Sequence, residues 1–237
     1  MGARISAIIP VYNGAATLPA ALASVRAQNW PDIEIVVVDD ASRDNSAEIA
    51  RSFGDDVVVI RLDENRGAAT ARNAGIERAR GDVIAFLDAD DLWPAGRLER
   101  MAARLAEAPP VDIVGGRVRV FGALDSPRLR PEVAADPHAY ALVFGCTLIR
   151  RSVFERVGPL AADLRIGHDT DWFLRAREAG VAIAVLDDDV LDYRIHRGGI
   201  TNDGRTARDE MAEALKRSLD RRRAAQPGPL SSWHRRP

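Results

Sequence analysis

The chain has 237 residues, of which 46% are hydrophobic, and a formal net charge of −2 at pH 7. It is therefore large enough to bury a core, and its charge gives no reason to expect a nucleic acid as partner. The single cysteine, Cys146, excludes an internal disulfide and a cysteine-based metal cage. No apolar run approaches the roughly 18 residues of a membrane span, and the N-terminus lacks a secretory signal, so we expect a cytoplasmic protein.

The first 90 residues alternate short apolar runs with helical segments. Strands are predicted at residues 5–9, 33–38 and 57–62, and a fourth apolar run follows Gly81. Helices are predicted from near Thr17, over residues 45–53, and over the Ala-rich segment that follows residue 65. This order predicts an α/β fold with a doubly wound, mostly parallel sheet and right-handed crossovers.

The fourth strand ends in three carboxylates, Asp88, Asp90 and Asp91. In open α/β sheets ligands bind at the carboxyl ends of the strands, and carboxylates this close repel one another unless a cation or a proton intervenes. Oxygen ligands without nearby Cys or His suit Mn²⁺ or Mg²⁺ bound together with a phosphate. Acidic turns also follow strands as solvated loops, so the rest of the chain must decide between these interpretations.

After residue 91 the pattern changes. A helix is predicted at residues 96–106, a strand pair at 111–121 broken by two glycines, a loop at 122–138, and a strand at 141–150. A further helix opens at residues 167–172, and a last core strand is predicted at 181–186. We therefore divide one domain at this point into residues 1–91 and a smaller half, residues 92–204.

Residues 205–237 form the third region, a polar helix followed by a flexible tail. The helix has a thin apolar line, Met211, Leu215 and Leu219, with three arginines behind it at residues 221–223. We expect it to lie outside the catalytic core with a solvated basic face. Contact with a partner, or peripheral contact with an anionic membrane surface, is the alternative.

Polar residues follow several strand ends and would meet on one side of the sheet. In this combination the chain resembles family 2 of the inverting glycosyltransferases, which have the GT-A fold. The resemblance covers roughly residues 5–200, with its motifs in order at compatible intervals. The matching segments lie at residues 9–13, 36–42, 65–67, 71–75, 88–93, 150–154 and 168–172.

The resemblance implies that residues 1–91 are the nucleotide-sugar-binding half and residues 92–204 the acceptor-binding and catalytic half. It also implies a donor nucleotide site. Pro10 and Tyr12 belong to the first turn, where the family holds the base, so Tyr12 would offer a stacking face. Asp39 or Asp40 would accept a hydrogen bond from a base N–H. Arg72 would pair with the diphosphate or with an acidic neighbour, and Asp88 would contact the ribose or the sugar.

The resemblance also implies the metal ligands and the base. Asp90 would bind Mn²⁺ or Mg²⁺, and His196 falls where the family often places a histidine near the metal or diphosphate. Asp169 matches the general base, with Asp171 as its rival. The chain departs from the family at His168, where a Glu is common, and Asp91 is interpreted as a helix-start residue.

The function implied is a metal-dependent inverting glycosyltransferase that moves a sugar from a nucleoside-diphosphate sugar, most simply a UDP-sugar, to a hydroxyl. The acceptor would be a glycan or a lipid-linked molecule in the synthesis of cell-surface polysaccharide or glycolipid. A sugar-nucleotide nucleotidyltransferase is the first alternative, although the turn at residues 11–14 is not the Gly-rich basic loop that it needs. A response-regulator-like module lacks its usual lysine. A nucleotide-sugar-binding module without catalysis is disfavoured by the intact Asp90 and Asp169.

Overall fold

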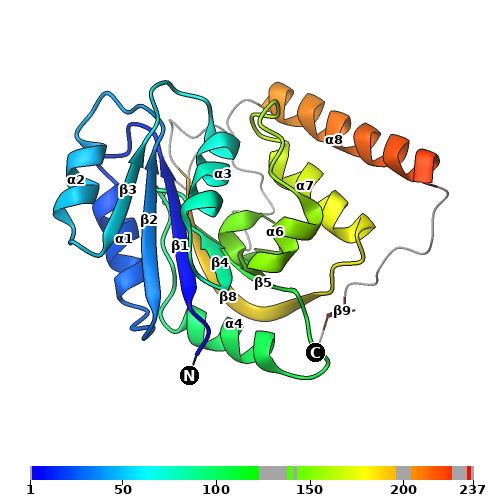
Figure 1. The fold of residues 1–237 in the computed structure, drawn as a ribbon, viewed down its shortest axis with the longest axis horizontal. Coiled ribbons are helices and arrows are strands. Elements are labelled where there is room, and N and C mark those ends of the chain that lie inside the picture. Colours follow the sequence, from blue (N-terminus) through cyan, green and yellow to red (C-terminus); the bar gives the residue numbers. More distant parts are fainter. Residues whose placement is uncertain (1, 123–137, 141–142, 196–203, 226–233, 236–237) are drawn as a thin grey trace.

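The computed structural model describes residues 2–122, 138–140, 143–195, 204–225 and 234–235. These residues form one mixed, mostly parallel sheet in the order β3-β2-β1-β4-β7-β5-β8-β9, with β6 paired to β5 (Figure 1). The elements are β1 (Ile5–Val11), α1 (Leu18–Arg26), β2 (Ile33–Asp39), α2 (Ser46–Ser52), β3 (Val57–Arg61), α3 (Ala68–Arg78), β4 (Val83–Phe86), α4 (Arg97–Ala106), β5 (Ile113–Gly122), β6 (His138–Tyr140), the 3-10 turn η1 (Phe144–Cys146), β7 (Thr147–Arg150), α6 (Arg151–Val157), α7 (His168–Glu178), β8 (Ile183–Ile195), α8 (Gly204–Ala225) and β9 (His234–Arg235).

The N-terminal half is a doubly wound sheet, as the sequence predicts. Strands β3, β2, β1 and β4 are parallel neighbours, and their apolar residues alternate between two cores. Ile9, Val37 and Ala85 face the core that holds α1, α2 and α4, whereas Ile8 and Val36 face the core that holds α3, α6 and α7. Runs of β-branched residues suit these strands because both faces of the sheet are covered.

The C-terminal half differs from the prediction in three places. The segment predicted as a broken strand pair is the single strand β5, whose pairing with β8 shifts register between Gly115 and Arg117. Within the described part of the segment predicted as a strand at 141–150, Phe144–Cys146 form η1 and Thr147–Arg150 form β7. The last strand continues to Ile195 beside β5, and most of the predicted loop at 122–138 lies outside the described residues.

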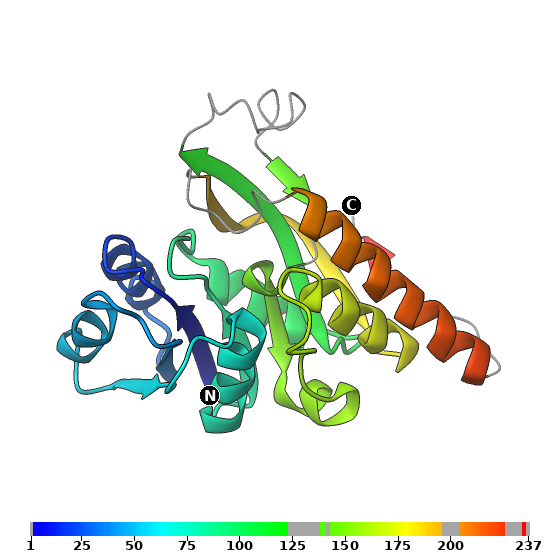
Figure 2. The same cartoon turned by 90° about the horizontal axis from the view of Figure 1, so that it is seen from above.

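Helix α8 lies alongside α7, and Ala214 and Ser218 are buried there (Figure 2). Arg217 pairs with Asp163, and Arg221 pairs with Glu178. Helix α8 is therefore packed against the core, and short and polar side chains make the contact. Met211, Leu215 and Leu219 point outward and are about half exposed.

Close approach of α3 to the sheet requires a glycine at position 75. A Cβ added to Gly75 would collide with the side chain of Ile8 on β1. Among the helices that the structure describes, none is both long and apolar enough to cross a bilayer.

We predict that Gly75→Ala lowers the free energy of unfolding. Overpacking costs about 1–3 kcal/mol, and the ~1 kcal/mol by which Ala exceeds Gly in a helix offsets only part of it. Urea unfolding measures the difference. Gly115→Ala is the matched control, because its added Cβ would have no neighbour nearer than 3.9 Å, and a stability loss of equal size there would contradict the packing argument.

Candidate active site

The carboxyl ends of β1, β2 and β4 lie side by side, since β1 pairs with both other strands in parallel. Tyr12 follows β1, Asp39 ends β2, and Asp88 stands shortly after β4. The first turn of α7 brings Asp169 to the same edge, within reach of Arg72 on α3. The structure thus brings together the residues that the sequence predicts to meet.

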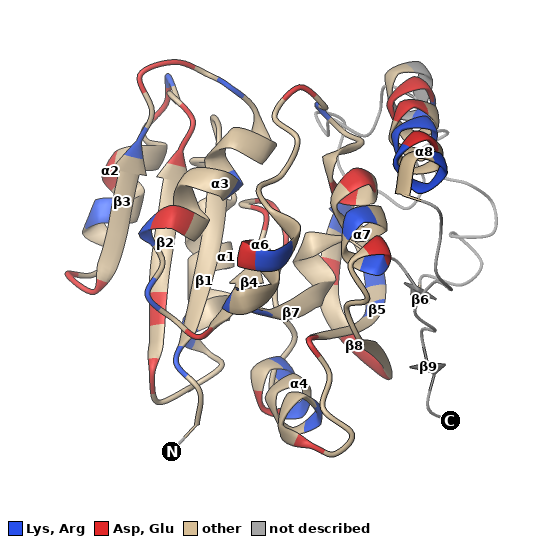
Figure 3. Ribbon diagram, turned by 45° about the vertical axis from the view of Figure 1, so that its right-hand side comes forward, with Lys and Arg blue, Asp and Glu red and all other residues tan. Residues whose placement is uncertain are grey.

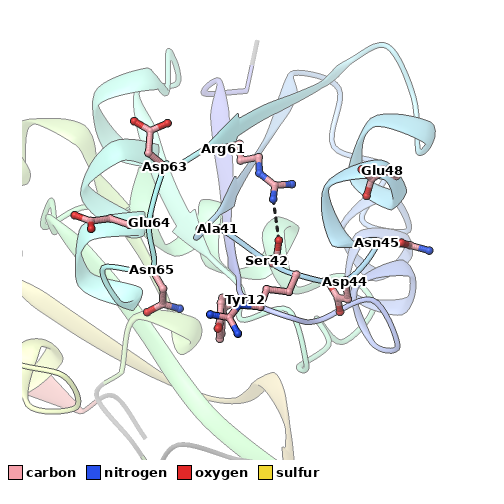
Figure 4. A pocket seen from close by; sticks show the side chains of 11 residues that line it. Tyr12, Ala41, Ser42, Asp44, Asn45, Glu48, Arg61, Asp63, Glu64 and Asn65 are labelled. Carbon is pink, nitrogen blue, oxygen red and sulfur yellow. Dashed lines mark hydrogen bonds between the residues drawn. The ribbon is translucent and has the colours of Figure 1, made fainter.

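A cavity opens at this edge, lined by Tyr12, residues 41–45, Glu48, Arg61 and residues 63–65 (Figure 4). The side chain of Tyr12 is 46% exposed, so it is not a packing residue and its ring is accessible for stacking. Pro10 lies within β1, buried opposite Val38 on β2. Pro10 is therefore part of the strand that leads to Tyr12 and not part of the cavity lining.

The two neighbouring aspartates have different partners. Asp40 accepts hydrogen bonds from the amides of Arg66 and Gly67, both at 2.8 Å, so its two oxygens hold the start of α3. Asp39 accepts from the amide of Ser42 at 3.0 Å, and its other oxygen has only the guanidinium of Arg61 at 3.2 Å. Asp39 is buried just behind Ala41 and Ser42 of the cavity lining, and among the described residues its Oδ2 has no hydrogen-bond donor, so of the two aspartates it has the acceptor oxygen to spare.

Arg72 is buried, being only 4% exposed, and lies between two carboxylates. Its Nη2 is 2.5 Å from Asp88 Oδ1, and its Nη1 is 3.5 Å from Asp169 Oδ1. Burial by itself would lower the pKa of Arg72, but Asp88 and Asp169 outweigh it and raise the pKa. The guanidinium thus stays charged and joins the end of β4 to the start of α7.

His168 contacts both Arg72 and Asp169 through the same nitrogen. Its Nε2 is 2.6 Å from Arg72 Nη1 and 2.9 Å from Asp169 Oδ1. A guanidinium can only donate and a carboxylate can only accept, so Nε2 accepts from Arg72 when it is unprotonated and donates to Asp169 when it carries the proton. His168 therefore lies between Arg72 and Asp169, a contact that the sequence does not signal.

Asp169 is held in its ionised form. Its Oδ2 accepts from the amide of Phe144 at 3.0 Å, and its side chain is 16% exposed. Burial would raise the pKa of Asp169, but Arg72, His168 and this amide outweigh it, so the pKa lies below its usual 3.8. Asp169 is not the helix cap, because that position belongs to Gly167.

Asp171, the rival base, is paired on both sides. It is 3% exposed, and its two oxygens contact Arg175 at 2.9 Å and Arg221 at 3.1 Å. These bonds join α7 to α8. The side chain that sequence spacing could not distinguish from Asp169 thus has a structural role.

The carboxylates after β4 also differ from one another. Asp90 stays partly exposed, whereas Asp91 is buried and its Oδ1 accepts from the amide of Arg194 at 2.8 Å. Burial, then the negative charges of Asp88 and Asp90, raise the pKa of Asp91 to about 9. Asp91 is therefore not a helix-start residue, and α4 begins only at Arg97. His196 lies outside the described residues.

Glu210 on α8 supports the start of α7 from the other side. Its carboxylate accepts from the amides of Ile166 and Gly167 at 2.6 and 2.9 Å. A Cβ at Gly167 would lie 2.9 Å from the backbone of Glu210, so the two segments pack tightly. The sequence predicts α8 but not this contact, because the spacing of residues carries no information on long-range docking.

The architecture and the site define a nucleotide-sugar transferase fold. The structure superposes on S. aureus TarS 1-349 in complex with UDP-GlcNAc with a TM-score of 0.75 at 22% identity, covering 92% of this chain and 66% of that one. It also matches the mannosyltransferase PcManGT from Pyrobaculum calidifontis, in complex with GDP-Man and Mn²⁺, with a TM-score of 0.69 at 24% identity, covering 97% and 66%. At these identities the likeness concerns the fold.

The chain belongs to glycosyl transferase family 2, whose model matches residues 6–158. It is 32% identical over 200 residues to glycosyltransferase AglE of Haloferax volcanii, covering 78% of this chain and 64% of AglE. It is 35% identical over 181 residues to a PGL/p-HBAD biosynthesis glycosyltransferase of Mycobacterium bovis, covering 72% and 68%. The chain thus spans about two thirds of the length of these relatives.

We predict that His168→Glu raises the pKa of Asp169. A second carboxylate in place of the imidazole adds a like charge next to Asp169, which disfavours its ionised form. Carbon-detected NMR titration of the aspartate carboxyls measures the shift. His168→Gln, a neutral control, should leave the pKa nearer to that of the wild type, and a pKa equal in all three proteins would contradict the contact.

Proposed function

We propose that the protein is a metal-dependent inverting glycosyltransferase that uses a nucleoside-diphosphate sugar, in the first instance a UDP-sugar. The observation that carries this proposal is the pairing of an ionised, positioned carboxylate, Asp169, with the acidic end of β4 through Arg72. The base cavity beside Tyr12 opens at the same edge of the sheet. The membership of glycosyl transferase family 2 supports the same reaction.

In the proposed reaction the acceptor oxygen attacks the anomeric carbon of the donor sugar. The bond from that carbon to the diphosphate breaks, and the diphosphate leaves with the electron pair. Asp169 takes the proton of the acceptor hydroxyl, for which it must be ionised, and its lowered pKa ensures this at neutral pH. Single displacement inverts the anomeric centre and needs no enzyme nucleophile.

The charges around β4 fit a divalent cation. Asp88, Asp90 and Asp91 lie together, and their mutual repulsion contributes to the raised pKa of Asp88 and of Asp91 after burial. Among the described residues no three His, Cys, Asp or Glu side chains are grouped so that they could hold a metal ion by themselves. Mn²⁺ and Mg²⁺ commonly take one or two carboxylates and complete their coordination with water and substrate phosphate. Asp90 would hold Mn²⁺ or Mg²⁺, with His196 as a proposed second ligand, and the ion would neutralise the departing diphosphate.

The other residues position the donor. Tyr12 would stack on the base and Asp39 would accept from a base N–H, since Asp40 is committed to α3. Arg72 is placed between Asp88 and Asp169, so it orients both carboxylates, and its partners leave it less free to bind the diphosphate itself. We further propose a cytoplasmic enzyme whose acceptor is a glycan or a lipid-linked hydroxyl in the synthesis of cell-surface polysaccharide or glycolipid. The name of the mycobacterial relative, a PGL/p-HBAD biosynthesis glycosyltransferase, supports this acceptor class.

We predict that binding of UDP requires both the metal and Asp90. Phosphates brought to these carboxylates without a cation meet uncompensated repulsion. Calorimetry should show binding with Mn²⁺ that EDTA weakens strongly, and Asp90→Ala should lose the dependence on Mn²⁺. Asp189→Ala, which removes a carboxylate of β8 that pairs with Arg117, is the control. Equal affinities with EDTA and Mn²⁺ would refute the metal assignment.

We predict that Asp169→Asn lowers turnover about 10²- to 10⁴-fold, the usual contribution of a general base. Its melting temperature and UDP affinity should stay close to those of the wild type, because Asn still accepts from the amide of Phe144 and Arg72 keeps its closer pair with Asp88. Turnover is measured as nucleoside diphosphate released from a panel of sugar nucleotides with candidate acceptors.

The matched control is Asp171→Asn, which removes the carboxylate that pairs with Arg175 and one of the two that pair with Arg221. We expect it to lower the melting temperature while reducing turnover less than Asp169→Asn does. Near-normal turnover in Asp169→Asn would show that Asp169 is not the general base. A wild-type protein that binds sugar nucleotides but turns none of them over would be a binding module.

A further inference from the structure

Helix α8 is attached to the enzyme by the face that a soluble amphipathic helix normally turns to water. Its inward contacts are the buried Ala214 and Ser218, and ion pairs from Arg217 and Arg221. Ser218 also bonds Glu178 on α7. The large apolar side chains of the helix stay about half exposed.

The outward face holds Met211, Leu215 and Leu219, which are 51%, 48% and 49% exposed. Residues at positions i, i+4 and i+8 lie one above the other on a helix, so the three form a continuous apolar stripe. These are three of the four large hydrophobic side chains that the described structure exposes, the fourth being Tyr12 in the cavity. The next described segment, β9, pairs with β8 and does not cover the stripe.

Basic residues flank the stripe. The exposed and half-buried charges outside the ion pairs with the core comprise four cations, at Arg208, Lys216, Arg222 and Arg223, against three carboxylates, at Asp209, Glu213 and Asp220. This excess contrasts with the net charge of −2 of the whole chain. Figure 3 shows α8 at the periphery of the molecule with its charged residues along it.

We propose that this outward face of α8, the apolar stripe with its flanking cations, docks on the surface of an anionic lipid bilayer. Helices that lie in a membrane interface combine an apolar line with Lys and Arg beside it, whose long stems reach up to the headgroups. Each basic residue near an anionic surface contributes about 1 kcal/mol, so the charges and the stripe act together.

A second copy of the chain fits the stripe less well. Three half-exposed side chains fall far short of the ~1,200 Å² that a stable specific interface buries. Pairing two such faces would also bring their excess positive charges together. The bilayer is therefore the occupant that both the apolar area and the charge favour.

Docking would also fix the orientation of the enzyme. The same helix holds the amides that precede His168 and Asp169 through Glu210. On the proposed function, the base would thus be held at a constant distance from the lipid surface, where a lipid-linked hydroxyl acceptor would be presented.

The test is sedimentation of the whole protein with vesicles of phosphatidylcholine alone or mixed with phosphatidylglycerol. We expect binding to the anionic vesicles that weakens with salt and is lost in Leu215→Glu/Leu219→Glu. Ala23→Glu/Ser52→Glu adds acidic charge on exposed positions of α1 and α2 and should retain binding. Lys216→Gln/Arg223→Gln should weaken it on the order of 30-fold.

Two results would overturn the proposal. One is no binding to anionic vesicles, or binding that Leu215→Glu/Leu219→Glu leaves unchanged. The other is a dimer in light scattering that this variant dissociates while vesicles fail to bind, which would make a second copy the occupant. Two further measurements are made on every variant. The melting temperature detects a failure of folding, and UDP calorimetry in solution detects a failure of the proposed function, so neither is mistaken for a failure of membrane docking.

Discussion

The buried guanidinium of Arg72 is the interaction on which the site depends. A charge that is 4% exposed is costly unless it is paired, and Arg72 reaches its partners on two elements that are far apart in sequence. Asp88 follows a strand of the N-terminal half, and Asp169 begins a helix of the C-terminal half. The two halves of the domain are therefore joined at the site by electrostatics as well as by packing.

This arrangement explains why the carboxylates of the site behave differently from one another. Asp169 has a cation, an imidazole and an amide around it, and its pKa is lowered. Asp91 has burial and negative neighbours, and its pKa is raised to about 9. Similar side chains on neighbouring elements thus acquire opposite protonation behaviour from their surroundings, which is the usual route to separate roles in one site.

The sequence predicts the elements of the N-terminal half because their β-branched runs and glycine stops are local signals. It also predicts which strand ends carry functional side chains. It does not separate Asp39 from Asp40, or Asp169 from Asp171, because the difference lies in partners such as the amide of Gly67 and the guanidinium of Arg221. For the same reason the sequence does not predict the short extent of β7 or the docking of α8, because both depend on contacts across the fold.

The clamp of Asp40 on the amides of Arg66 and Gly67 has a consequence for how this chain can vary. It anchors the first turn of α3, and Arg72 follows on that helix. Each residue inserted or deleted between the anchor and Arg72 would rotate the guanidinium by about 100° about the helix axis, away from both carboxylates. Side chains in this interval can change, but its length cannot, so insertions and deletions among functional relatives should be absent here even where the amino acids diverge.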